Sequence, residues 1–144
     1  MEPHIRLLIV DDAPRSRDGL RALLSTVRLC HAPNGKEDIG QRVWPEIKVV
    51  GEAADGEQAI NLVETCRPDV VLMDARMPII DGLEATRRIK KRWPEVKVIV
   101  LTVYAAYRSA AQAAGADAFV IKGAPPAELL EAILDPREEE DDVQ

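Results

Sequence analysis

The sequence predicts an α/β protein built on a doubly wound, five-stranded parallel sheet. Three observations support this fold class. Short apolar runs alternate with segments that carry apolar residues at helical spacing, Pro, Gly or Asp marks many of the boundaries, and the length of 144 residues suits one compact domain. Alternation of this kind implies right-handed crossovers, with helices on both faces of the sheet.

Five apolar runs are the predicted strands. Continuous runs of Val, Ile and Leu are typical of strands that are buried on both faces of a parallel sheet. Four of the runs are prominent, and a weaker one precedes Gly51. The runs are LLIV (7–10), KVV (48–50), VVLM (70–73), VIVL (98–101) and FVI (119–121).

Helical patterns lie between and after these runs. Pro14 suits the first turn of the first helix, Asp55-Gly56 opens the second, and Gly115 follows the fourth as a stop. The fourth pattern is rich in Ala and has a weaker apolar face than the others. The apolar stripes run along Leu20–Val27, Ala59–Cys66, Leu83–Trp93, Ala105–Ala114 and Leu129–Leu134.

One segment is too long for the usual link between a helix and a strand. Residues 27–46 separate the first helix from the second strand, whereas such links usually have about 2–6 residues. Asn34 is a candidate N-cap within it, and an apolar stripe that ends at Trp44 predicts a short helix near Lys36–Val43. We therefore expect one domain over residues 1–135 with an insert at 27–46, followed by an acidic tail at 136–144.

Composition excludes several classes of function. The net charge of −6 and the EEEDD run near the end argue against nucleic-acid binding by this chain alone, because phosphate backbones need a basic face. No apolar run has the length of a membrane span, and residues 1–6 do not resemble a signal peptide. Cys30 and Cys66 are not spaced as a metal or redox pair, so we expect ordinary thiols in a cytoplasmic protein.

Polar residues follow four of the predicted strands where each strand ends. Asp11 and Asp12 follow the first, Asp74 the third, Thr102 the fourth and Lys122 the fifth. In a parallel sheet all these ends meet at one edge, which is the edge where such folds bind ligands. Asp is also a common N-cap, which could account for any one of these carboxylates alone. It accounts poorly for the whole set.

The chemistry of this set suggests a phosphate and a hard cation. Crowded carboxylates repel one another unless a cation joins them, and oxygen ligands without His or Cys favour Mg²⁺. A carboxylate can act as a nucleophile toward phosphorus and form an aspartyl phosphate. Lys122 and the metal would then neutralise charge on the transferring group.

Four motifs in this order closely resemble the response-regulator receiver domain of two-component signalling. They are IVDD (9–12), VVLMDARMPIIDG (70–82), VLT (100–102) and FVIK (119–122). The resemblance covers most of the chain from Ile5 to Leu134 except the insert, and it implies a flavodoxin-like (βα)5 receiver fold. Val103 and Gly123 resemble the branch that usually precedes a helix-turn-helix output domain.

The resemblance assigns a role to each site residue. It implies that Asp74 is the phosphoacceptor, which is phosphorylated by a histidine kinase. Asp12 would bind Mg²⁺ directly, Asp11 would act beside it through water, and Asp74 and the backbone carbonyl of Arg76 would complete the protein ligands. Thr102 would bond the phosphoryl group as the switch hydroxyl, Lys122 would pair with that group, and Phe119 would be the switch aromatic. A core residue of the fifth strand is an equally good interpretation of Phe119.

Two other interpretations remain open at this stage. A phosphatase of the haloacid dehalogenase type also uses an Asp nucleophile and Mg²⁺, but it needs DxD after the first strand, and Ala13 breaks that motif. A receiver-like interaction scaffold that is not phosphorylated is the main alternative. We expect a signalling module rather than an enzyme. Its partners would be a histidine kinase or phosphotransfer protein and an unidentified downstream effector, and homodimerisation is compatible with the sequence.

Overall fold

The computed structural model describes residues 4–25 and 46–135. The expected short helix near Lys36–Val43, nearly all of the expected insert and the expected acidic tail lie outside these residues. The described elements, in chain order, are β1 (His4–Val10), α1 (Pro14–Ser25), β2 (Glu46–Ala53), α3 (Gly56–Cys66), β3 (Val70–Asp74), α4 (Gly82–Arg92), β4 (Lys97–Thr102), the 3-10 helix η2 (Ala105–Tyr107), α5 (Arg108–Ala113), β5 (Ala118–Ile121) and α6 (Pro126–Leu134).

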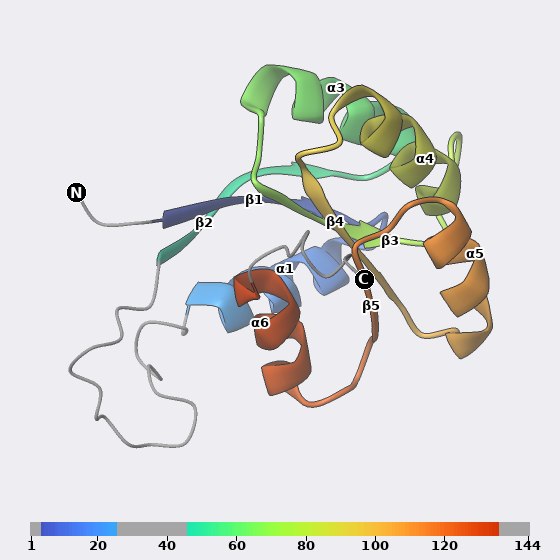
Figure 1. Ribbon diagram of the computed structural model, residues 1–144. Coiled ribbons are helices and arrows are strands. Elements are labelled where there is room, and N and C mark those ends of the chain that lie inside the picture. The colour runs from blue at the N-terminus through green and yellow to red at the C-terminus, as the bar shows by residue number, and fades with distance from the viewer. Residues whose placement is uncertain (1–3, 26–45, 136–144) are drawn as a thin grey trace, which may run out of the picture.

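One parallel sheet organises these elements. Its five strands lie in the order β2-β1-β3-β4-β5, and every neighbouring pair is parallel. The chain therefore moves outward from β1 to β2, crosses back to β3, and then continues to β4 and β5 (Figure 1). This topology confirms the predicted doubly wound sheet, and it brings the carboxyl ends of all the strands to one edge.

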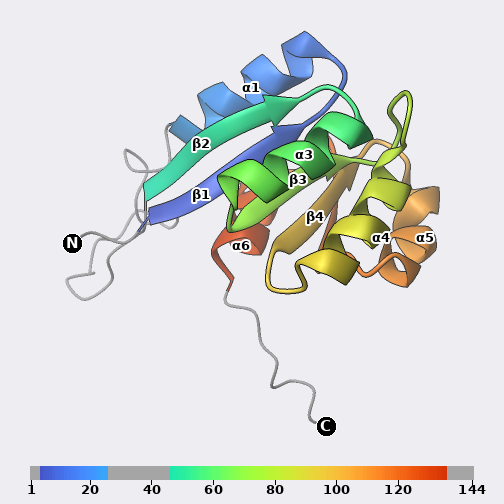
Figure 2. The same ribbon diagram turned by 90° about the horizontal axis from the view of Figure 1, so that it is seen from above.

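Helices cover both faces of the sheet. Figures 1 and 2 show α1 and α6 on one side and α3, α4 and α5 on the other. The first face buries Leu24 of α1 and Ile133 of α6 against Ile9 and Leu72 of the central strands. The alternation of side chains along each strand accounts for this arrangement, because neighbouring residues such as Leu72 and Met73 serve opposite faces.

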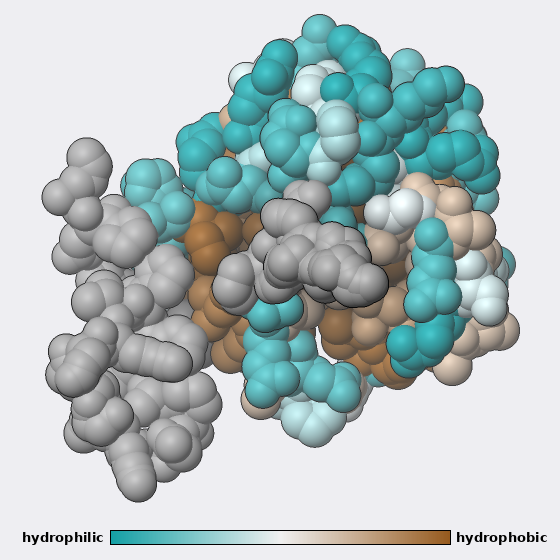
Figure 3. Space-filling view, viewed as in Figure 1, coloured by the Kyte–Doolittle hydropathy of each residue, from teal (hydrophilic) through white to brown (hydrophobic). Residues whose placement is uncertain are grey.

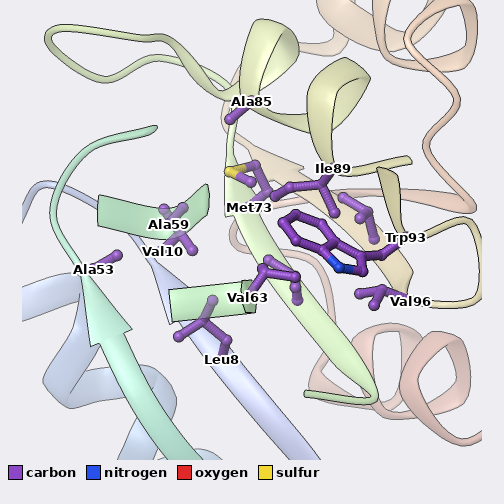
Figure 4. Packing of buried hydrophobic residues seen from close by; sticks show 12 residues of the cluster. Leu8, Val10, Ala53, Ala59, Val63, Met73, Ala85, Ile89, Trp93 and Val96 are labelled. Atoms are coloured by element: carbon purple, nitrogen blue, oxygen red, sulfur yellow. The ribbon is translucent and has the colours of Figure 1, made fainter. Parts of the chain in front are cut away.

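The second face carries a large cluster under α3 and α4. Leu8, Met73 and Val98 contribute from the strands, and Ala59, Val63, Ala85 and Ile89 contribute from the helices (Figure 4). Figure 4 shows the indole of Trp93, directly after α4, extending into this cluster, where it is 6% exposed. Such close packing holds β1 and β3 rigidly beneath their loops.

Two elements differ from the sequence prediction. Strand β2 extends on both sides of the expected KVV run, and its register against β1 shifts between Leu7 and Leu8. The expected Ala-rich helix at 105–114 is divided into η2 and the six-residue α5. No side chain caps the amino end of either piece, which agrees with the lack of a regular first turn.

Candidate functional site

An open cavity of about 610 Å³ lies at the carboxyl edge of the sheet. The loops after β1, β3, β4 and β5 supply its walls. Its lining includes Asp12, Asp74, Arg76, Thr102, Tyr104 and Lys122. Apart from Tyr104, these are predicted site residues, and the structure brings them to one place, as the parallel topology requires.

Three carboxylates form the acidic part of the site. Asp11, Asp12 and Asp74 each offer an oxygen, and these oxygens all lie within 4.8 Å of one another. Asp11 is buried, Asp74 is half-buried and Asp12 is exposed. Two of the three are therefore partly shielded from water, which makes their mutual repulsion strong unless a cation compensates it.

Lys122 supplies a positive charge between two of these carboxylates. Its Nζ lies 2.7 Å from Asp11 Oδ2 and 3.3 Å from Asp74 Oδ2. The backbone N–H of Lys122 donates to the carbonyl of Thr102 at 2.8 Å, so the residue is tied to the end of β4. This backbone bond fixes the point directly after β5 from which the Lys122 side chain extends.

Asp11 is held in place by several donors. Its carboxylate accepts hydrogen bonds from the backbone N–H of Ala13 at 2.9 Å and from the hydroxyl of Ser16 at 2.6 Å. With Lys122, these donors surround a side chain whose residue is only 2% exposed. The first turn of α1 thus fixes a buried carboxylate beside the cavity.

The environments of the charged groups shift their pKa values in different directions. Burial raises the pKa of Asp74, the Lys122 charge only partly offsets this, and the nearby charge of Asp11 adds to the increase. Burial also raises the pKa of Asp11, but hydrogen bonds from Lys122, Ser16 and Ala13 outweigh it and hold the pKa below its ordinary value. Burial lowers the pKa of Lys122, whereas its bond to Asp11 and the two carboxylate charges bring it above the usual value.

Thr102 and Phe119 occupy the positions from which a switch could act. Thr102 is the last residue of β4 and is 2% exposed, and its hydroxyl accepts from the backbone N–H of Tyr104 at 3.2 Å. Phe119 on β5 is half-buried beside Val100 and Ala111. The guanidinium carbon of Arg108, at the start of α5, lies 4.6 Å from the centre of the Phe119 ring.

Arg76 and Tyr104 bridge two loops at the rim of the cavity. Arg76 lies in the loop after β3, and its guanidinium carbon is 5.3 Å from the centre of the Tyr104 ring, in the loop after β4. The backbone N–H of Arg76 also donates to Asp74 Oδ1 at 3.3 Å. Tyr104 in turn meets Tyr107 edge to face, with ring centres 5.8 Å apart.

Gly82 sets how closely α4 approaches the site. A Cβ at this position would lie 1.8 Å from the carbonyl oxygen of Asp74, so only glycine allows the contact. The N–H of Gly82 donates to the carbonyl of Ala75 at 2.9 Å, and Asp81 caps the helix by accepting from Glu84. Sequence reasoning included Gly82 in a motif without giving it this role, and it missed Ser16 entirely.

The donor set fits a hard divalent cation. Three carboxylates within ligand distance carry three negative charges against the one ammonium of Lys122, which leaves the cluster with a net negative charge. All the candidate ligand atoms are oxygens, and neither His nor Cys belongs to the cluster. Such a site suits Mg²⁺ better than a transition metal.

Polar residues cover the outer surface of α3 and α4, and the surface beside α5 is less polar (Figure 3).

Within residues 4–25 and 46–135, no helix combines the length and apolar character needed to span a bilayer.

Comparisons with known proteins agree with this geometry. A family model described as the response regulator receiver domain matches residues 39–134. The response regulator UvrY of Escherichia coli K12 is 40% identical over 90% of this chain and 52% of its own length. The chain spans about half the length of the curated relatives that it matches.

Solved structures show the same fold. The receiver domain of the putative response regulator NarL from Mycobacterium tuberculosis has a TM-score of 0.75 and 28% identity, covering 92% of this chain and 95% of that one. The receiver domain of the histidine kinase PA1611 from Pseudomonas aeruginosa has a TM-score of 0.70 and 28% identity, covering 90% of this chain and 94% of its own. In that structure a magnesium ion is coordinated in the active-site cleft.

Proposed function

Because the chain belongs to the family of response regulator receiver domains, we propose that it accepts a phosphoryl group on Asp74 and thereby switches its partner interactions. One observation carries the proposal. Asp74 lies at the end of β3, and one of its carboxylate oxygens is within 4.8 Å of an oxygen of Asp11 and of Asp12. Lys122 Nζ is 3.3 Å from the Asp74 carboxylate. A nucleophilic carboxylate, a cation site and a fixed ammonium are the parts that phosphoryl transfer needs.

The step forms one bond and breaks another. An oxygen of Asp74 attacks phosphorus, and the bond from phosphorus to the donor's histidine nitrogen breaks, which leaves an aspartyl phosphate and a histidine. The nitrogen takes up the electron pair of the broken bond. Lys122, already near Asp74, pairs with the transferred oxygens, and Arg76 and Tyr104 enclose the rim.

A cation would be held by oxygen ligands from two loops. Asp12 and Asp74 would bind it directly, Asp11 would act through water, and the backbone carbonyl of Arg76 would complete the protein ligands. When bound, Mg²⁺ supplies positive charge for the oxygens of the phosphoryl group. The exposure of Asp12 and the fixed position of Asp11 suit this division of roles.

Thr102 and Phe119 would transmit the event. The Thr102 hydroxyl would leave the Tyr104 N–H and bond the phosphoryl group, and Phe119 would turn inward. The change is a shift between two populated states that the new bonds bias.

The same proposal covers partners and boundaries. A histidine kinase or a phosphotransfer protein would supply the phosphoryl group, and the effector that detects the phosphorylated state is not identified. We propose residues 1–135 as the receiver unit and 136–144 as a separate acidic tail. Self-association into a homodimer is compatible with the proposal. The net charge of −6 argues against nucleic-acid binding by this chain alone.

The experiment is incubation with acetyl phosphate and MgCl₂, followed by intact-mass measurement. Wild type should gain one phosphoryl group in MgCl₂. It should gain none when EDTA replaces MgCl₂ in the incubation. Asp74→Asn should abolish the gain, and Asp12→Ala should suppress it by weakening the cation site. Asp18→Asn is the matched control, because it removes an exposed carboxylate of α1 that does not line the cavity.

Two outcomes would contradict the proposal. If Asp74→Asn gained one phosphoryl group at the wild-type rate, another residue would be the acceptor. If wild type gained none in MgCl₂ while Mg²⁺ binding was measurable, the non-phosphorylated scaffold would be the better interpretation.

A further inference from the structure

We infer that Arg17 is a positioning residue for the cation site, which acts by holding the peptide that joins Asp11 to Asp12. The inference rests on the proposed function, since it concerns the same carboxylates. It adds a residue that does not line the cavity itself.

Arg17 makes two contacts from the second turn of α1. Its Nη1 donates to the backbone carbonyl of Asp11 at 2.7 Å, and its Nε donates to Glu52 Oε1, on β2, at 3.0 Å. The Arg17 side chain is 20% exposed and that of Glu52 is 25% exposed. Partial burial strengthens both contacts compared with a surface ion pair.

The carbonyl that Arg17 contacts belongs to the peptide plane between the two aspartates. This plane also contains the nitrogen of Asp12 and fixes its Cα, because the peptide bond does not rotate freely. On the other side of Asp11, its own N–H donates to the carbonyl of Ala53 at 3.0 Å. The backbone on both sides of Asp11 is therefore bound to other elements.

Asp12 depends on this support more than Asp11 does. The Asp11 side chain is buried and has three donors of its own, whereas Asp12 is exposed. Within residues 4–25 and 46–135, the Asp12 side chain makes no hydrogen bond or ion pair. The backbone therefore sets the direction in which the Asp12 side chain leaves its Cα, and Arg17 holds the peptide that leads into this residue.

Arg21 provides a matched control one turn further along α1. It pairs with the same carboxylate, at 2.6 Å from Nη2 to Glu52 Oε2, but it does not contact Asp11. Removing either arginine deletes one positive charge and one partner of Glu52. Only the removal of Arg17 frees the peptide between the aspartates.

The test is titration with MgCl₂ by isothermal calorimetry on wild type, Arg17→Gln and Arg21→Gln. We expect Arg17→Gln to weaken Mg²⁺ binding roughly tenfold, as loss of a residue that supports a metal ligand usually does. Arg21→Gln should weaken Mg²⁺ binding by less than about twofold, because the Arg21 side chain is exposed and the surrounding salt largely screens its charge. Urea unfolding of each variant checks that it remains folded.

A second measurement reports on the peptide without any metal. The carbonyl carbon of Asp11 and the amide of Asp12 should shift in the NMR spectrum of Arg17→Gln, and both should stay in place in Arg21→Gln. Arg17→Lys keeps the charge but loses the two-pronged donor, so it should restore less than half of the lost binding free energy. This variant also serves if Arg17→Gln does not fold.

The outcomes separate this inference from the proposed function. Equal Mg²⁺ affinity in wild type and Arg17→Gln, equal losses in Arg17→Gln and Arg21→Gln, or full recovery by Arg17→Lys would each overturn the positioning role. None of these outcomes would contradict the proposal that Asp74 is phosphorylated. If wild type bound no Mg²⁺ and took up no phosphoryl group, the proposed function itself would fail.

Discussion

Asp11 and Asp74 carry the same functional group and lie within 4.8 Å of each other, but they differ in their donors. Asp11 has three strong donors, while Asp74 has one weak backbone bond and a longer contact with Lys122. Burial affects both. The pKa of Asp74 is therefore raised and that of Asp11 is lowered. The proposed phosphoacceptor, Asp74, is thus the carboxylate that has the weaker hydrogen-bond donors.

This difference predicts opposite effects of the same substitution on stability. In EDTA at pH 7, Asp74→Asn should raise the free energy of unfolding by about 1 kcal/mol, because it removes a charge that the folded state disfavours. Asp11→Asn should lower it by about 2 kcal/mol, because the charged hydrogen bonds are lost. Urea unfolding followed by circular dichroism measures both.

The pH dependence gives the internal check. Because the pKa of Asp74 is raised in the folded state, its ionisation lowers the free energy of unfolding as pH rises from about 3.8 through the folded pKa. The increase in the free energy of unfolding that Asp74→Asn causes at pH 7 should therefore shrink as the pH falls toward 4. A lowered folded pKa means that the contribution of Asp11 persists at pH 4 and is lost only as pH falls further. A gain for Asp74→Asn that did not change with pH would argue against this explanation.

Residues at strand ends were predictable, and residues that act through others were not. Asp11, Asp12, Asp74, Thr102 and Lys122 follow buried apolar runs, and a parallel sheet must bring such ends together. The contact between Arg17 and the Asp11 carbonyl depends on the path of a long side chain between a helix and a strand. A sequence pattern does not specify that path.

The helix–loop junctions decide how close the helices come to the site. The carbonyl of Asp74 lies where a Cβ of Gly82 would be, and a Cβ of Gly56 would lie 2.2 Å from the carbonyl of Ile80. The N–H of Gly56 donates to that same carbonyl at 3.0 Å. The loop after β3 is thus fixed by a glycine on each side.

Gly82→Ala should therefore destabilise the fold by about 3 kcal/mol, because backbone atoms would have to move apart. The matched control is Gly19→Ala in α1, where a Cβ would meet nothing within 4 Å. That change should stabilise the fold by up to about 1 kcal/mol, since Ala favours a helix over Gly. Urea denaturation midpoints compare the two, and a similar shift in both would contradict the packing argument.

Loop conformation shows the limit of prediction at this scale. All five strands were located because each is an apolar run in a sheet that helices cover on both faces. Ile79, by contrast, has a φ of 68° and is 73% exposed, which is rare for a β-branched residue. No residue pattern marks it, because the constraint comes from the surrounding loop.

The contact between the loops after β3 and β4 predicts a long-lived phosphorylated state. Arg76 lies 5.3 Å from the Tyr104 ring, and neither side chain has a carboxylate or amide oxygen to orient an attacking water. Arg76→Asn combined with Tyr104→Glu should speed loss of the phosphoryl group about tenfold or more. Intact mass over time measures the decay. If the double variant lost the group no faster, the lifetime would be set elsewhere.

At the scale of the whole molecule, one edge of the sheet connects the proposed acceptor, Asp74, to the surface formed by α5. Asp74, Thr102 and Lys122 lie at the ends of adjacent strands, and the Lys122 N–H is bonded to the Thr102 carbonyl. Phe119 continues this path to Arg108 on α5. The sequence predicted the parts of this path, because each lies on or beside a buried strand. The stacking of Arg108 on Phe119 was not predictable, since η2 and α5 depart from the expected regular helix.

This arrangement predicts that phosphorylation changes the region of η2, α5 and β5 more than the region of α3. Beryllofluoride with MgCl₂, which mimics the phosphoryl group, should shift amide resonances from about Tyr104 to Lys122, including Arg108. The control region is Gly56–Cys66 of α3, which packs on the same face through a separate cluster and should change little. Asp74→Asn should abolish all the shifts, because the mimic needs the carboxylate. Shifts confined to residues that line the cavity would mean that the mimic binds without moving Phe119, and the proposed switch would then be wrong.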